Sequence, residues 1–438
     1  MKKLLYSLLT LTIFWAGCKK DGNQNPPDSN PGLKIEIVSG NNQRDTIGKL
    51  LKDSIIIKVT DNGAAAANYT LQYQRSGCED ISIAQRTTSS SGSANYSWYL
   101  SGETGKQTLK IIVLDNNGNK KDSISAVATG IAASHGWHSS GCVQNFPVNS
   151  FSKLSSGRLF ASLNGNNYLY YSDNNAASWL PLKGFTNNYF ITKLLASGTS
   201  NEVFVATQTS GFFYSPDAGK TWYNRTAGIE DPTGFADMTY TKKGRLIYCV
   251  NSGVYISEDK GLTWTQADLD LPSGQSFSPC EQTNGDLYII GPDHELYKST
   301  NEGSSWNNQG SSVGNYILAS VESLYIDSSG NIFVAIPHDG AGTNGEIYES
   351  SDKGLTWKRV FSKPGNSSSY TNIEQISKYS SNYYFSFAGK GVYKTADFTT
   401  FSNITTRYAS YGLLSYTVAA NSSFVIGSPG FGVFYYVQ

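Results

Sequence analysis

One eight-residue turn recurs along this chain. It reads SPDAGKTW at 215–222, SEDKGLTW at 257–264 and SSDKGLTW at 350–357, and degenerate copies stand at 172–179 and 299–306. The closing tryptophans lie 43, 42, 42 and 51 residues apart, in the order Trp179, Trp222, Trp264, Trp306 and Trp357. A period in the low forties with several short strands per copy is typical of the blades of a β-propeller.

Two strand-like segments precede each turn. The nearer one alternates and carries aromatic residues, as in GFFYS (211–215) and GVYIS (253–257). The more distant one is apolar throughout, as in RLIYCV (245–250) and NIFVAI (331–336). Because a continuous apolar run indicates a strand that is covered on both faces, we expect the distant segment in the middle of each blade.

The strand pattern continues past the last intact turn. It recurs at 382–395 and at 423–437, where the chain stops one strand short of a full blade. Trp137 stands at the position of a fourth strand, although the turn before it is missing. We therefore expect an all-β chain with a seven-bladed propeller over 134–438, closed by pairing an N-terminal strand with the three last ones.

The repeated turn resembles the Asp-box, or BNR, repeat of sialidases and related propellers. The resemblance implies that the turn joins the third and fourth strands of a blade, on the face away from the ligand site. In such a turn the Asp accepts backbone N–H groups, the Gly permits a positive φ and the Trp packs between sheets. The predicted structural residues are Asp217, Gly219, Trp222, Asp259, Gly261, Trp264, Asp352, Gly354 and Trp357.

Residues 33–131 carry a different pattern. Segments such as DSIIIKVTDNG (53–63) and QTLKIIVLDNNGN (107–119) alternate apolar and polar residues between tight turns, which predicts one β-sandwich. The stretch resembles a bacterial Ig-like domain of the invasin type. That resemblance implies a stalk or spacer.

The first residues predict export. Lys2 and Lys3 precede an apolar run that is too short to span a bilayer, which is typical of a signal peptide over 1–17. The sequence AGC resembles a bacterial lipobox, which implies acylation of Cys18; an ordinary cleaved signal or a plain buried cysteine are the alternatives. The Pro- and Asn-rich stretch 18–32 is expected to be a flexible tether. We therefore expect a monomer attached by lipid to the bacterial cell envelope, at the outer membrane or cell surface.

Charge and cysteine content narrow the range of partners. Lys and Arg number 34, and Asp and Glu also number 34, so nothing favours nucleic acid. The cysteines Cys78, Cys142, Cys249 and Cys280 lack the close spacing of a metal site, and we expect no metal and no cofactor. Cys249 and Cys280 fall in neighbouring predicted strands, so a disulfide and two buried free thiols are equally open.

The face opposite the repeated turns is where a ligand is expected, because loops converge there on a rigid scaffold. We call it the loop face. The candidate ligand-binding residues are Arg225, His294, Tyr316, His338, Arg359 and Tyr370. The weak catalytic candidates, carboxylates that could act in glycoside hydrolysis, are Asp237, Asp293, Asp339 and Glu374.

The resemblance to sialidases implies their fold but not their sialidase activity. Sialidases bind the substrate carboxylate through three arginines and carry an Arg-Ile-Pro or Arg-Leu-Pro motif, which this chain lacks. They also have six blades. We therefore expect a non-catalytic propeller that binds glycan or a surface protein through its loop face. The alternative is a glycoside hydrolase, sialidase-like or otherwise exo-acting, on surface glycans.

Overall fold

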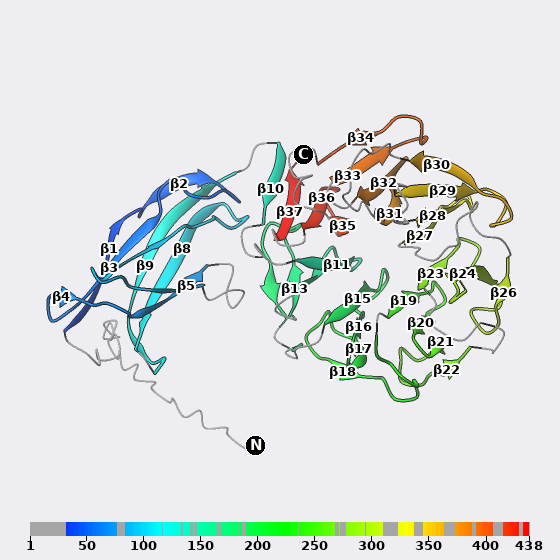
Figure 1. Ribbon diagram of the computed structural model, residues 1–438, viewed down its shortest axis with the longest axis horizontal. Helices are drawn as coiled ribbons and strands as arrows, with labels where there is room; N and C mark the ends of the chain where they lie inside the picture. The colour runs from blue at the N-terminus through cyan, green and yellow to red at the C-terminus, as the bar shows by residue number, and fades with distance from the viewer. Residues whose placement is uncertain are drawn as a thin grey trace, which may run out of the picture.

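The computed structural model describes most of the chain from Gly32 onward. The ranges are 32–76, 84–115, 117–132, 135–140, 143, 147–163, 168–182, 184–185, 190–234, 236–267, 271, 277–293, 295–309, 323–336, 345–362, 373–387, 391–405, 415–428 and 432–437. All regular elements in these ranges are β-strands. No helix that is long and apolar enough to cross a bilayer occurs in them. Figure 1 shows a pair of twisted sheets beside a ring of smaller sheets.

Two sheets form the N-terminal part. One contains β1 (Leu33–Ser39), β3 (Ile55–Asp61), β4 (Ala64–Ala65) and β7 (Ser93–Tyr96). The other has the order β2-β9-β8-β5-β6 and contains β2 (Gln43–Thr46), β5 (Thr70–Arg75), β6 (Ala84–Thr87), β8 (Gly105–Leu114) and β9 (Lys120–Ile131). Alternate residues of both sheets, such as Ile57 and Ile111, meet around the fully buried Trp98 in a single core. We call this part the sandwich.

The rest of the described chain forms seven four-stranded antiparallel sheets. Six of them follow the chain order and contain β11 (Val148–Lys153), β12 (Leu159–Leu163), β13 (Tyr168–Ser172), β14 (Leu180–Pro181); β15 (Ile191–Ala196), β16 (Val203–Thr207), β17 (Gly211–Ser215), β18 (Tyr223–Asn224); β19 (Asp237–Tyr240), β20 (Leu246–Val250), β21 (Gly253–Ser257), β22 (Thr265–Gln266); β23 (Phe277–Glu281), β24 (Leu287–Ile290), β25 (Leu296–Ser299), β26 (Asn307–Asn308); β27 (Ser323–Ile326), β28 (Ile332–Ile336), β29 (Glu346–Ser350), β30 (Lys358–Ser362); and β31 (Ile373–Tyr379), β32 (Asn382–Phe387), β33 (Gly391–Thr395), β34 (Ser402–Asn403).

The seventh sheet joins the two ends of the ring. It contains β35 (Ser415–Val418), β36 (Phe424–Ser428) and β37 (Gly432–Val437), and its fourth strand is β10 (Gly136–Ser139). Trp137 pairs with Tyr436, and its indole Nε1 donates to the carbonyl of Ile404 at 2.7 Å. The pairing covers the sheet edge that would otherwise stay open.

The second strand of each sheet holds the core, as the sequence predicts. Every residue of β12, β16, β20 and β28 is buried. These strands pack against the strands of the neighbouring sheets, for example Phe204 against Tyr240 with ring centroids 4.9 Å apart. Stability therefore comes from contacts between successive sheets around the ring.

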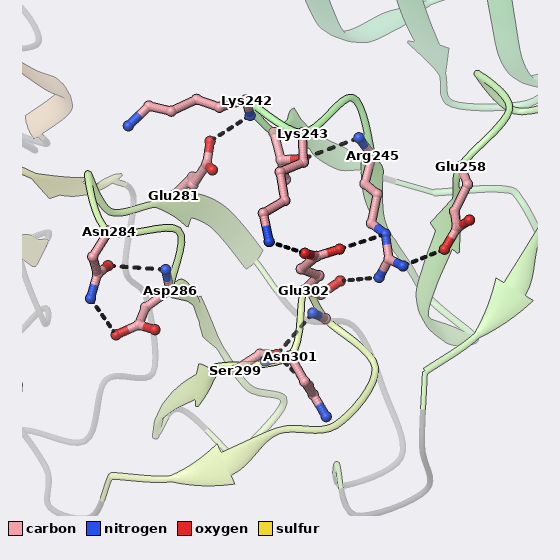
Figure 2. A network of polar contacts seen from close by, with 12 residues as sticks. Lys242, Lys243, Arg245, Glu258, Glu281, Asn284, Asp286, Ser299, Asn301 and Glu302 are labelled. Carbon is pink, nitrogen blue, oxygen red and sulfur yellow. Dashed lines mark hydrogen bonds and ion pairs between the residues drawn. The ribbon is translucent and has the colours of Figure 1, made fainter.

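Charged side chains connect neighbouring sheets at the repeated turns. Arg158, just before β12, donates from Nη1 to the carbonyl of Ala218 at 3.2 Å. Arg245, just before β20, does the same to the carbonyl of Glu302 at 3.3 Å and also pairs with the carboxylates of Glu302 and Glu258 (Figure 2). Ala218 and Glu302 occupy the same position in their turns, immediately before the glycine. The repeated turn therefore holds the preceding sheet as well as its own.

Candidate functional site

Each intact repeated turn is closed by the same hydrogen bonds. The Oδ1 atoms of Asp217, Asp259 and Asp352 each accept the backbone N–H of the residue four positions on, at 2.8 Å. The first serine of each turn accepts the N–H of Gly219, Gly261 or Gly354, at 2.8, 2.7 and 2.8 Å. The φ values of these glycines are 86°, 86° and 94°, in the region that disfavours a side chain.

Both oxygens of each of these carboxylates accept hydrogen bonds within the turn. Asp352 also accepts the hydroxyl of Thr356 at 2.5 Å, and these bonds lower the pKa of Asp352 to about 2. The indole of Trp222 donates to the carbonyl of Gly219 at 2.9 Å. These aspartates therefore bond chiefly to groups of their own turn.

Arg225 lies away from the loop face, contrary to the sequence-based expectation. Its guanidinium stacks 4.1 Å above the ring of Tyr214. Its Nη1 donates to the carbonyls of Asp259 and Lys260, at 3.2 and 3.0 Å, in the repeated turn of the next sheet. Arg225 therefore fastens neighbouring sheets together, as Arg158 and Arg245 do.

The first strands of the sheets surround the centre of the ring (Figure 1). Asp237 opens β19 at the loop-face end, and its Oδ1 lies 2.7 Å from the ammonium of Lys193 on β15. Its Oδ2 accepts the backbone N–H of Ser278 on β23 at 3.1 Å. The Asp237 carboxylate thus joins three successive sheets, and its charge is neutralised by Lys193.

Two further carboxylates lie toward the loop-face ends of the third strands. Asp293 accepts the hydroxyl of Tyr297 at 2.6 Å, and burial together with this bond raises the pKa of Tyr297. Glu346, at the start of β29, accepts the hydroxyl of Tyr348 at 2.6 Å and pairs with Nη1 of Arg359 at 2.9 Å. The Glu346 side chain is 8% exposed and that of Arg359 is 55% exposed. A buried carboxylate therefore positions an arginine that faces solvent.

Several predicted site residues fall outside the described part of the chain. These are Cys18, His294, Tyr316, His338, Asp339 and Tyr370, together with the side chain of Glu374. Sequence reasoning in turn missed Glu346 and Lys193, which the structure joins to Arg359 and Asp237. The only signal for Glu346 was its place at the start of a predicted strand after a glycine-rich stretch.

Cys249 and Cys280 are free thiols, which decides between the two alternatives for this pair. Burial raises the pKa of both, that of Cys280 to about 11, so neither resembles an activated nucleophile. Within the described ranges, no group of three or more His, Cys, Asp or Glu side chains could hold a metal ion. Three described carboxylates near the loop face are engaged by a cation or a hydroxyl donor: Asp237 by Lys193, Asp293 by Tyr297, and Glu346 by Arg359 and Tyr348.

Comparison with known proteins establishes the fold class. No protein-family model matches the sequence, and neither does any curated protein. Solved structures do match: YCF48 bound to a D1 peptide has a TM-score of 0.51 at 11% identity, over 67% of this chain and 93% of YCF48. A catalytically inactive virginiamycin B lyase from Staphylococcus aureus has a TM-score of 0.53 at 9% identity, over 67% of this chain and 96% of the lyase.

A bacterial extracellular domain gives a similar match. That of BT4673 from B. thetaiotaomicron has a TM-score of 0.51 at 14% identity, over 67% of this chain, which spans only 40% of that protein's chain. These structures and the ring of sheets agree on one class: the chain is an all-β protein with a β-propeller fold. At such low identities the likeness shows the fold alone.

Proposed function

We propose that this protein is exported, attached by lipid to the bacterial cell envelope, and binds a glycan or a protein through the loop face without catalysis. One observation supports the non-catalytic part: three carboxylates near the loop face, those of Asp237, Asp293 and Glu346, are already engaged by Lys193, Tyr297 and Arg359. A general acid or a nucleophile needs a carboxyl group that is free to meet substrate.

The architecture supports this proposal. The seven sheets are the blades of a seven-bladed propeller of the Asp-box type, and the sandwich is an Ig-like domain that separates it from the anchor at Cys18. YCF48 was solved with a peptide bound, and the BT4673 domain is extracellular. The first is a precedent for a propeller that binds a peptide, and the second is a precedent for a propeller outside the cytoplasm.

The test is a glycan array with soluble protein that begins near residue 33, followed by a reducing-sugar release assay on every glycan that binds. We expect binding without release, and we expect Arg359→Ala to weaken it, because Arg359 is half-exposed and held in place by Glu346. Arg86→Ala, an exposed arginine of the sandwich, is the matched control. Sugar release would support the glycoside hydrolase alternative instead, and silence on all glycans would leave a protein ligand.

The anchor is tested separately. Cys18→Ser should move the full-length protein from the membrane fraction to the soluble fraction, because serine lacks the thiol that would be acylated. Unchanged membrane attachment of the variant would refute the lipid anchor.

A further inference from the structure

Two loops of the sandwich meet the rim of the ring at very short range. A Cβ added at Gly102 would stand 1.9 Å from the carbonyl oxygen of Ala177. One added at Gly48 would stand 2.4 Å from the carbonyl oxygen of Ser139. Figure 1 shows this end of the sandwich beside β10 and β13. Both loops therefore require glycine where they touch the propeller backbone.

A buried glutamine holds one of these loops in shape. Gln107 is 3% exposed, and its Oε1 accepts the N–H of Ser101 at 2.8 Å. Its Nε2 donates to the carbonyls of Ser101 and Glu103, at 3.3 and 2.6 Å. Because every polar atom of this side chain is used, the loop that carries Gly102 and Glu103 is fixed before it meets the ring.

The turn that receives this loop is the degenerate copy 172–179. Its Asn174 replaces the usual aspartate, and Oδ1 of Asn174 still accepts the N–H of Ser178 at 2.9 Å. The amide nitrogen Nδ2 then points to Ser178 Oγ at 2.7 Å and donates to it. In the intact turns the hydrogen bond runs the other way, from the threonine hydroxyl to the aspartate, as from Thr263 to Asp259 at 2.6 Å.

This reversal frees a donor for the sandwich. The hydroxyl of Ser178 donates to Oε1 of Glu103 at 3.1 Å. A carboxylate only accepts, so the bond requires a hydroxyl proton that an aspartate at position 174 would have taken. Asn301 donates to Ser305 in the same way at 2.8 Å, but there no bond from Ser305 to the sandwich exists among the described residues.

The chain enters the sandwich at one end and leaves it at the other. Leu33 pairs with Asp61 at the end where Lys120 begins β9, and Ile131 lies at the other end, beside Thr46. Twelve residues of β9 separate these ends by roughly 35–40 Å. Figure 1 looks down the centre of the ring, with the sandwich in the plane of the ring beside it.

From these contacts we propose that the sandwich is a rigid bracket rather than a flexible spacer, and that it holds the propeller at a fixed angle at the end opposite Leu33. The rigidity of this junction does not depend on the proposed function or on the anchor at Cys18.

Small-angle X-ray scattering of the soluble protein tests the junction without any ligand. Wild type should fit one rigid body. Asn174→Asp should lose that fit and show a larger maximum dimension, because the new carboxylate takes the Ser178 hydroxyl and faces Glu103. Asn301→Asp, the same change in a turn away from the sandwich, should leave the scattering unchanged. Since the aspartate form of the turn occurs elsewhere in the chain, Asn174→Asp is expected to fold.

A steric pair checks the same junction. Gly102→Val should loosen it, while Gly198→Val, where a Cβ meets nothing within 4 Å, should not. Scattering from Asn174→Asp and Gly102→Val that matches wild type would overturn the bracket.

Discussion

Ser257→Ala tests whether the first residue of the repeated turn stabilises the propeller. Ser257 is 1% exposed, and its Oγ accepts the N–H of the buried Gly261 at 2.7 Å and donates to Asp259 at 2.9 Å. An alanine fits the same space but leaves the Gly261 N–H without a partner. An unsatisfied buried donor costs about 1–3 kcal/mol, and the lost bond to Asp259 adds about 1 kcal/mol. We therefore expect the free energy of unfolding to fall by about 2–4 kcal/mol.

Urea titration followed by tryptophan fluorescence measures this change in the propeller, since six of the eight tryptophans lie in 134–438. Ser304→Ala is the matched control, because Ser304 is the exposed serine of a related turn and should change the free energy by no more than about 0.5 kcal/mol. If Ser257→Ala behaves like Ser304→Ala, the repeated turn does not depend on its buried serine and the reasoning is wrong.

Three further changes follow from contacts between and within sheets. Glu202→Gln and Lys260→Gln should show a coupling of about 0.5–1 kcal/mol in a double-mutant cycle, and salt should reduce this coupling because Lys260 is 42% exposed. If no coupling is measured, the Glu202–Lys260 ion pair does not stabilise the contact between the two sheets. Although burial opposes it, hydrogen bonds from Lys260, Ser200 and Tyr214 lower the pKa of Glu202 below 4.5. The contribution of the Glu202 carboxylate to the free energy of unfolding is therefore present above pH 4.5 and lost as the pH falls further. Acid unfolding of Glu202→Gln should accordingly be less steep than that of wild type. Gly219→Ala should lower the free energy of unfolding, measured by urea titration, by about 1–2 kcal/mol, because φ is positive and Leu182 lies 2.8 Å from the new Cβ. An unchanged urea midpoint would show that the turn relaxes around the alanine.

The fold was largely predictable because the same sequence pattern repeats several times along the chain. A turn that recurs with Asp, Gly and Trp at fixed positions identifies the hairpins, and a fully apolar segment such as that of β20 identifies the middle strand. Both signals are local, and repetition makes each copy support the others. The pairing of Trp137 with the last sheet was also expected, because an incomplete blade at one end requires a strand from the other.

The contacts between sheets could not be predicted in the same way. Arg225 follows a predicted outer strand, which suggested the loop face, yet its guanidinium reaches the turn of the next sheet. The position of the Arg225 guanidinium depends on how neighbouring sheets pack against each other, and the pattern of residues along the sequence does not show this packing. The pairing of Glu346 with Arg359 and the docking of Glu103 on Ser178 are likewise contacts between segments that only the folded chain brings together.

The two faces of the ring thus differ in whether their polar side chains bond within the protein or remain exposed to solvent. On the face of the repeated turns, aspartates, serines and arginines bind one another or the neighbouring backbone, so substitutions there should change stability before they change binding. In the turn that carries Asn174, the Ser178 hydroxyl donates to Glu103 of the sandwich. On the loop face, Arg359 is held by a buried carboxylate while half of its surface remains in solvent. Loss of ligand without loss of stability is therefore expected only for residues of that second kind, and Arg359→Ala compared with Ser257→Ala separates the two.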